Sequence, residues 1–297
     1  DPVPPEDPGP IEVPEDPDSQ VGQVYELGPH RLVCGDCRDP AVVASLLDGR
    51  AINVAITSPP YASQRTYDPS SSFKPIRPAD FVDWFQLVQA QVAQHLAPDG
   101  SWFLNIKEHC DDGQRVLYVK DLTLAHVRRW GWRLVDELCW QRVGLPGSYP
   151  NRFKNGWEPV FHYSRASEIK FRPDSVAHEF DATGAITCDE VVALGRSSGY
   201  TSEGSLGGPG SVKSKHRTTA LPSNVLAASG VGTGVAHPAM YPVALPTFLL
   251  KAYTDPGDIV FDPFLGGGTT LVAAAAERRV CYGVEISPGY CDVIRKR

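Results

Sequence analysis

Residues 57–61, with the sequence Thr-Ser-Pro-Pro-Tyr, bring together groups that could hold a planar amine. They end an apolar segment, residues 52–57, that is predicted to form a buried strand. The two prolines fix the backbone and donate no hydrogen bond, so their carbonyl groups are free to accept one. A serine hydroxyl and a rigid carbonyl would then accept the two hydrogens of an NH₂ group, while the aromatic ring stacks on its plane. For the two prolines alone, a strand end with a core tyrosine would be favoured, but the complete five-residue motif favours the ligand-binding interpretation.

A second candidate is the glycine-rich stretch at residues 261–270, Phe-Asp-Pro-Phe-Leu-Gly-Gly-Gly-Thr-Thr. A strand, a glycine turn and a helix bring backbone N–H groups close to a ligand. The next predicted strand ends in Glu285, whose carboxylate could accept hydrogen bonds from both ribose hydroxyls of a nucleoside. The stretch is not G-x-G-x-x-G and lacks the P-loop lysine, which disfavours a dinucleotide or a nucleoside triphosphate. A tight turn beside a solvated Glu285 is the alternative.

The two motifs, in this order and at this separation, resemble those of the β-class S-adenosylmethionine-dependent DNA amino-methyltransferases of the N4-cytosine type. In that family the catalytic motif precedes the cofactor motif, and a target-recognition region lies between them. The resemblance spans roughly residues 28–297 and is weakest over residues 166–235. It implies S-adenosyl-L-methionine as cofactor and double-stranded DNA as partner, and it allows a cognate restriction endonuclease and a homodimer.

The resemblance assigns a catalytic set in which Ser58 Oγ and the Pro59 carbonyl accept the amine hydrogens and Tyr61 stacks on the base. It also implies that the carboxylate of Asp36 meets the adenine edge of the cofactor. Residues 237–242, His-Pro-Ala-Met-Tyr-Pro, are similar to a family segment that usually has Phe where this chain has Tyr241. The catalytic set is Ser58, Pro59, Pro60 and Tyr61, and the cofactor set is Asp36, Thr57, His237, Pro238, Asp262, Phe264, Gly266, Gly268, Thr269, Thr270 and Glu285.

A base inside a duplex must be flipped out of the stack to reach such a crevice. Residues just after the catalytic motif, basic residues at 142–154 and basic residues in the Gly/Ser-rich stretch at 196–220 could contact the DNA. For each charge taken alone, a solvated surface position is the favoured interpretation. The predicted DNA-binding residues are Arg65, Tyr67, Arg142, Arg152, Lys154, Lys213, Lys215 and Arg217.

The leading interpretation is methyl transfer to the N4 amine of a flipped cytosine, because family members with Ser before Pro-Pro-Tyr mostly modify cytosine. Members with Asp there mostly modify adenine N6, and adenine is the close alternative. A dinucleotide oxidoreductase would have no use for residues 57–61. A catalytically dead DNA-binding module would need a damaged motif, and none is damaged.

Two other patterns are set aside. Cys34 and Cys37 form a single pair with no second pair at zinc spacing, so core thiols and no metal site are predicted. His162 lies in a predicted strand and is expected to be packed or to face DNA rather than to act as a base.

Strands alternating with helices predict a parallel α/β sheet with helices on both faces. The resemblance makes it a Rossmann-like methyltransferase sheet, mostly parallel with an antiparallel edge strand, and circularly permuted so that its termini lie close together. Strands are predicted at residues 31–36, 52–57, 101–106, 132–141, 158–163, 259–261 and 280–286. Helices are predicted at residues 39–47, 79–96, 116–130, 241–253 and 288–297, and a further helix follows the glycine-rich stretch and ends at residue 276.

The chain has 297 residues and a formal charge of −7, with 35 acidic and 28 basic residues. Seven of the acids fall in residues 1–20, so the remainder is neutral and compatible with a polyanionic partner. We predict a disordered acidic tail at 1–20, a catalytic and cofactor domain at 21–165 and 236–297, and a target-recognition region at 166–235. Seven scattered cysteines and no apolar membrane or signal segment indicate a reducing compartment, expected to be the prokaryotic cytosol or nucleoid, or a phage-encoded setting.

Overall fold

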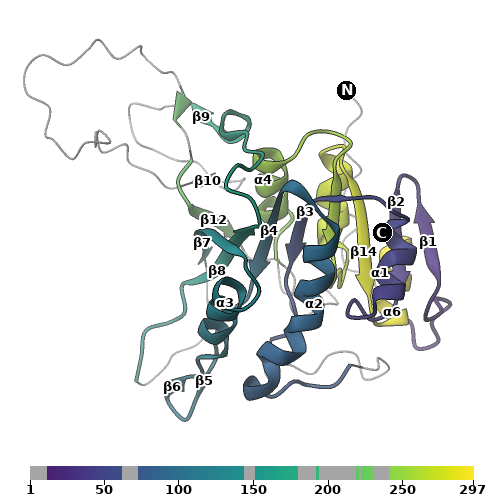
Figure 1. Cartoon of the computed structure of the whole chain (residues 1–297), viewed down its shortest axis with the longest axis horizontal. Helices are drawn as coiled ribbons and strands as arrows, with labels where there is room; N and C mark the ends of the chain where they lie inside the picture. The colour runs from purple at the N-terminus through teal and green to yellow at the C-terminus, as the bar shows by residue number, and fades with distance from the viewer. Residues whose placement is uncertain are drawn as a thin grey trace, which may run out of the picture.

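The computed structural model describes residues 12–61, 73–143, 151–179, 192–193, 219–220, 222–229 and 241–297. Within these ranges ten strands form one sheet in the order β1-β2-β14-β13-β3-β4-β8-β7-β12-β10 (Figure 1). In that order they are β1 (Val24–Leu27), β2 (His30–Cys34), β14 (Val280–Glu285), β13 (Ile259–Asp262), β3 (Ile52–Thr57), β4 (Leu96–Asn105), β8 (Trp157–Ser164), β7 (Arg133–Val143), β12 (Val225–Ser229) and β10 (Val192–Ala193).

Two short strand pairs lie outside this sheet. They are β5 (Cys110–Asp111) with β6 (Gln114–Arg115), and β9 (His178–Glu179) with β11 (Thr219–Ala220). The helices are α1 (Pro40–Leu47), α2 (Phe81–His95), α3 (Tyr118–Arg128), α4 (Ala244–Tyr253), α5 (Thr269–Ala276) and α6 (Pro288–Lys296), with 3₁₀ turns η1 (Pro78–Asp80) and η2 (Pro173–Val176).

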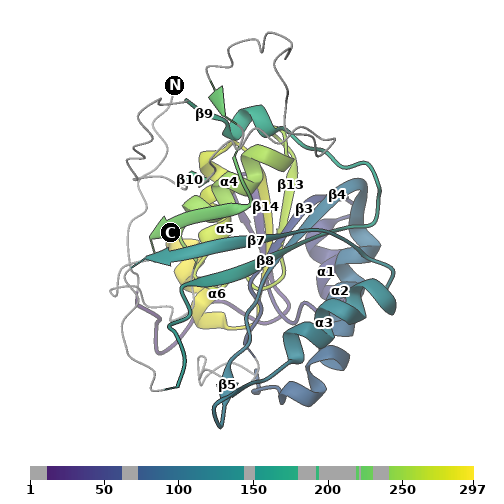
Figure 2. The same ribbon diagram turned by 90° about the vertical axis from the view of Figure 1, so that its left-hand side faces the viewer.

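The helices cover both faces of the sheet. Figure 2 shows α1, α2 and α3 on one side and α4, α5 and α6 on the other. Side chains alternate along the strands accordingly: Trp102 and Leu104 of β4 belong to the core beneath α1–α3, whereas Phe103 between them belongs to the core beneath α4–α6. This two-sided burial explains why the central strands are apolar throughout, as is usual for parallel sheets.

The strand directions bring the carboxyl ends of five strands to one edge of the sheet. Strands β2, β14, β13, β3 and β4 are mutually parallel, so their carboxyl ends meet there. The chain connections reverse between β13 and β3, which is the topological switch point where open α/β sheets bind ligands. The predicted mostly parallel α/β fold is confirmed, and the edge strand β1 runs antiparallel to β2.

The end of the predicted acidic tail contacts α6. The backbone N–H groups of Asp18 and Ser19 donate to the Asp292 carboxylate at 2.7 and 3.0 Å, and the Ser19 hydroxyl does so at 2.6 Å. Ser19 is buried by this contact with α6. Residues 18 and 19, within the stretch predicted as a tail, are therefore held against α6. The same contact joins the first described segment to the last helix, as a permuted sheet requires.

The predicted recognition region, residues 166–235, contacts the rest of the fold at two places in its described part. The Lys170 ammonium lies 2.7 Å from the Asp258 carboxylate, and the Arg172 N–H donates to the Ala252 carbonyl at 2.6 Å. Near its other end β12 pairs with β7 and buries Leu226 completely. Residues 170–172 and β12 therefore pack against the main sheet and its helices, and the reading of DNA by the remainder stays a prediction. Among the described residues, no helix is both long enough and apolar enough to span a bilayer.

Candidate active site

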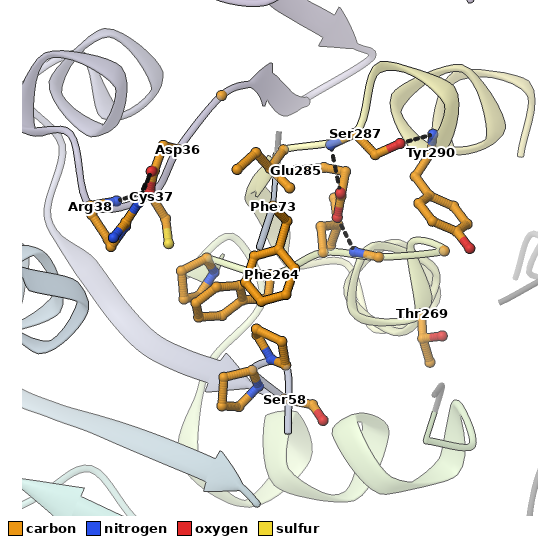
Figure 3. A pocket seen from close by; sticks show the side chains of 18 of the residues that line it. Asp36, Cys37, Arg38, Ser58, Phe73, Phe264, Thr269, Glu285, Ser287 and Tyr290 are labelled. Carbon is orange, nitrogen blue, oxygen red and sulfur yellow. Dashed lines mark hydrogen bonds and ion pairs between the residues drawn. The ribbon is translucent and has the colours of Figure 1, made fainter. Parts of the chain in front are cut away.

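A pocket that opens to solvent lies at this switch point, where open α/β sheets bind their ligands. In Figure 3, Ser58 lies at one end, Asp36 and Glu285 lie at the other, and Phe264 and Phe73 lie between them. The lining residues are Gly35, Asp36, Cys37, Arg38, Ser58, Pro59, Pro60, Phe73, Trp84, Tyr241, Pro263, Phe264, Leu265, Gly266, Gly267, Thr269, Glu285, Ile286, Ser287 and Tyr290.

The glycine turn after β13 depends on two conformations that side chains disfavour. Gly266 has φ +56° and Gly268 has φ +85°, both in the left-handed region. Gly268 then caps α5, so the turn redirects the chain from strand to helix within a few residues. Because the Gly266 N–H donates to the Glu285 carboxylate at 2.8 Å, the turn orients that acid as well as lining the pocket.

Glu285 is buried at the end of β14, and both of its carboxylate oxygens accept backbone hydrogen bonds (Figure 3). Oε2 accepts from Gly266 N and Oε1 accepts from Ser287 N at 2.9 Å. Burial raises the pKa of Glu285 to about 7, although these N–H donors act in the opposite direction. The pocket therefore holds a fixed carboxyl group poised to ionise near neutral pH.

This raised pKa predicts how the stability of the ligand-free protein depends on pH. The folded state binds the Glu285 proton more tightly than the unfolded chain, so the unfolding free energy falls as pH rises from roughly 4.5 towards 7. We expect Glu285→Gln to remove this loss, so that wild type becomes less stable relative to the variant across that window. Denaturant unfolding at several pH values measures the difference, with the exposed Glu26→Gln as control. If the unfolding free energies of wild type and Glu285→Gln change with pH in parallel, burial does not raise the pKa of Glu285 in the folded protein.

Asp36 forms the second acidic group of the pocket and is held by a close neighbour. The Arg38 guanidinium lies 2.6 Å from its carboxylate and also stacks over the Trp84 ring at 5.4 Å. Burial opposes ionisation of Asp36, but the hydrogen bonds from Arg38 outweigh it and lower the pKa of this carboxyl. Trp84 in turn packs against Phe264 with ring centroids 5.9 Å apart. This end of the pocket thus combines an anion with flat apolar surfaces.

Four predicted cofactor residues lie outside the pocket lining and support it from behind. Asp262 is buried, and it accepts hydrogen bonds from Phe264 N at 3.0 Å, Tyr241 Oη at 3.2 Å and Thr270 Oγ1 at 2.5 Å. Burial raises the pKa of Asp262 to about 6. Besides Asp262 and Thr270, the set includes Gly268 and Thr57, whose hydroxyl accepts from Trp102 Nε1 at 3.0 Å.

These contacts explain a departure from the family pattern. The hydroxyl that distinguishes Tyr241 from the usual Phe donates into the Asp262–Thr270 pair and stabilises a buried acid. His237 and Pro238, also predicted to contact the cofactor, lie outside the described residues. Asp36, Phe264, Gly266, Thr269 and Glu285 do line the pocket.

The catalytic motif follows β3 directly, and its residues separate into two groups. Ser58, Pro59 and Pro60 line the pocket. Tyr61 is buried and does not line it, because its hydroxyl lies 3.2 Å from both Asn105 Oδ1 and Glu158 Oε2. These two contacts fix the Tyr61 ring from its hydroxyl end.

Three of the eight predicted DNA-binding residues can be placed. Arg142 Nη1 lies 2.7 Å from Glu158 Oε1, Arg152 Nη1 lies 3.4 Å from Asn155 Oδ1, and Lys154 is exposed. The others, Arg65, Tyr67, Lys213, Lys215 and Arg217, lie outside the described residues.

The residues set aside in the sequence have structural roles. Cys34 and Cys37 are buried free thiols, and no cluster of potential metal ligands occurs in the described ranges. His162 is fully buried, with its ring stacked on Phe103 at 4.3 Å and its Nε2 2.9 Å from Ser101 Oγ, so the packed interpretation is confirmed.

Several residues that line the pocket were not predicted from the sequence, although some lie in recognisable sequence patterns. Ser287 precedes Pro288 and caps α6 by accepting from Tyr290 N, a pattern typical of helix starts. Trp84 is part of the apolar face of the predicted helix at 79–96. Arg38 and Phe73 lie in segments without periodicity and carried no such signal.

Comparison with known proteins points to one family. The family model N6_N4_Mtase, described as DNA methylase, matches residues 52–296. The type II methyltransferase M.PvuII of Proteus hauseri is 26% identical over 263 residues, covering 81% of this chain and 76% of its own length. M.MwoI of Methanothermobacter wolfeii is 26% identical over 230 residues, covering 75% of this chain but only 27% of its own length.

Two solved structures share the fold. The PvuII DNA methyltransferase, described as cytosine-N4-specific, has a TM-score of 0.64 and 22% identity, covering 93% of this chain and 90% of its own. A putative DNA modification methylase from Thermus thermophilus, complexed with S-adenosyl-L-methionine, has a TM-score of 0.54 and 20% identity, covering 90% of this chain and 92% of its own.

Proposed function

The chain belongs to the N6/N4 DNA methylase family, and from this premise we propose that it transfers a methyl group from S-adenosylmethionine to the N4 amine of a cytosine in duplex DNA. The observation that carries the proposal is one pocket that contains both Ser58-Pro59-Pro60 and the two strand-end carboxyl groups, Asp36 and Glu285. A methyl donor and an amine acceptor must meet in such a shared space.

The chemistry of the pocket fits this cofactor. Glu285 offers carboxylate oxygens fixed by Gly266 and Ser287, suited to ribose hydroxyls, and Asp36 offers an acceptor for an exocyclic amine of adenine. The rings of Phe264 and Trp84 give a flat apolar surface for the purine. These features support a nucleoside-containing ligand bound with its reactive end towards Ser58.

When bound, S-adenosylmethionine supplies an activated methyl group: the amine nitrogen forms a bond to the methyl carbon, the carbon–sulfur bond breaks with its electrons moving to sulfur, and the extra proton leaves nitrogen for solvent. The protein must hold the amine in line with this methyl group. Ser58 Oγ and the Pro59 carbonyl accept the amine hydrogens and favour a pyramidal nitrogen. A serine hydroxyl is no strong base at neutral pH, so it orients the amine rather than deprotonating it.

We assign DNA binding to the basic residues predicted from the sequence, and the reading of the target sequence to the part of residues 166–235 other than residues 170–172 and β12. The relatives named type II methyltransferases support a place in a restriction–modification system, with a cognate endonuclease as partner. The cytosine-N4-specific PvuII enzyme, with its similar fold, and the Ser58-Pro59-Pro60 sequence favour cytosine over adenine N6.

A salt titration tests the DNA assignment. Replacing Lys213, Lys215 and Arg217 together with alanine is expected to weaken binding to all sequences and to flatten the plot of log affinity against log salt by about 0.9 for each phosphate that is no longer neutralised. Lys296→Ala is the control, because this exposed lysine ends α6 at the opposite end from the pocket residue Tyr290. An unchanged slope in the triple variant would exclude these side chains from phosphate binding.

Methylome sequencing tests the function in cells. DNA from cells that express the wild-type chain is expected to carry N4-methylcytosine in one fixed sequence context, at a level that is strongly reduced when Ser58→Ala is expressed. Methylation of adenine N6 in a fixed context would show that the target base is adenine and not cytosine. No methylation above the Ser58→Ala background would refute the activity.

A further inference from the structure

We propose that Asn105 is a positioning residue that turns the Ser58 hydroxyl into a hydrogen-bond acceptor for the target amine. The inference rests on the proposed function and adds to it a residue outside the catalytic motif. It is carried by a polar cluster behind the pocket wall, in which Asn105 lies between Ser58, Tyr61 and the carbonyl of Pro159.

Asn105 is buried at the last position of β4, next to the end of β3 that carries Ser58. Its Nδ2 donates to the Pro159 carbonyl on β8 at 3.0 Å, which fixes the orientation of the amide. Its Oδ1 consequently faces the catalytic motif, 3.5 Å from Ser58 Oγ and 3.2 Å from the Tyr61 hydroxyl oxygen.

The direction of the hydrogen bond between Ser58 and Asn105 follows from the groups involved. A hydroxyl has one hydrogen, and an amide oxygen can only accept, so Ser58 must donate to Asn105 Oδ1. With its hydrogen turned inward, Ser58 Oγ presents lone pairs to the pocket, where an amine N–H can donate. The 3.5 Å separation is long, and catalytic hydrogen bonds of ligand-free enzymes commonly tighten when substrate binds.

A buried ion cluster reinforces this arrangement. Glu158 Oε2 lies 3.2 Å from the Tyr61 hydroxyl, and Glu158 Oε1 is paired with Lys107 and, at 2.7 Å, with Arg142. A charged carboxylate is a stronger acceptor than an amide oxygen, so the Tyr61 hydrogen is drawn towards Glu158. This leaves Asn105 Oδ1 with capacity to accept from Ser58.

A double-mutant cycle on the full chain tests the proposal through the single-turnover rate of methyl transfer to DNA. Asn105→Leu, which keeps the volume but removes the acceptor, is expected to slow transfer roughly tenfold to 10²-fold in wild type but less than about threefold in the Ser58→Ala background. Asn105→Asp retains an acceptor oxygen in either protonation state and is expected to stay within about fivefold of wild type.

Cofactor affinity and thermal unfolding are measured for every variant, and Asn105→Ala replaces the leucine if that variant does not fold. Equal slowing in the wild-type and Ser58→Ala backgrounds would overturn the proposal, because a purely structural residue would act independently of the serine hydroxyl. The proposed function fails separately, if wild type itself transfers no methyl group to DNA. If the methyl group is transferred to adenine N6 and the Asn105→Leu effect still depends on Ser58, the proposed target base is wrong but the role of Asn105 is supported.

Discussion

Ser58→Ala is expected to lower the single-turnover rate of methyl transfer by roughly 10²-fold while leaving S-adenosylmethionine affinity nearly unchanged. The size follows from the loss of one oriented hydrogen-bonding group at the reacting atom. The split between rate and affinity follows from position, because Ser58 lies at the far end of the pocket from Asp36 and Glu285 (Figure 3).

Rapid mixing of a preformed enzyme–DNA complex with labelled cofactor measures the rate, and calorimetry measures the affinity. Ser45→Ala is the matched control, because this serine is exposed on α1 and its hydroxyl donates to the Val42 carbonyl of its own helix. A Ser58→Ala variant as fast as wild type would show that its hydroxyl does not touch the amine.

Glu285→Ala is expected to weaken S-adenosylmethionine binding by about 1.5 to 3 kcal/mol, or roughly tenfold to 10²-fold in dissociation constant. A buried charged acceptor for ribose hydroxyls is removed, and the N–H groups of Gly266 and Ser287 lose their partner as well. Calorimetry at pH 8, above the raised pKa of Glu285, compares the ionised wild type with the variant.

Two further variants test whether the loss of affinity is specific to the Glu285 carboxylate. Glu26→Ala removes an exposed glutamate of β1 outside the pocket and is expected to bind the cofactor like wild type. Glu285→Gln keeps the shape of the side chain and one carbonyl acceptor, so its cofactor affinity is expected to lie between those of wild type and Glu285→Ala. Unchanged affinity in Glu285→Ala would remove Glu285 from the cofactor site.

The parts of the site that sequence reasoning found are those encoded locally. The turn at residues 262–268 and the strand ending in Glu285 each combine an apolar run with glycines or an acid within a few residues. Their meeting in one pocket then follows from parallel strand order, because carboxyl ends of neighbouring parallel strands share an edge.

The parts that sequence reasoning missed depend on contacts between distant segments. Glu158 reaches the Tyr61 hydroxyl only because β8 pairs antiparallel with β4, and residues 61 and 158 give no sign of this pairing. Tyr61 illustrates the limit: the motif predicts a ring for stacking, but the buried hydroxyl contacts could not be read from it. The hydrogen bond between Ser19 and Asp292 was also missed, because it joins opposite ends of the sequence.

The identity of the methylated base tests the account most directly. Purified protein is incubated with labelled S-adenosylmethionine and mixed-sequence duplex DNA, the DNA is digested to nucleosides, and these are separated by mass spectrometry. Label in N4-methyldeoxycytidine, accumulating roughly 10²-fold more slowly when Ser58→Ala is used, is the result that we predict. Label on adenine N6 would contradict the choice of base, and label on the ring carbon C5 of cytosine would contradict the mechanism built on Ser58 and Pro59.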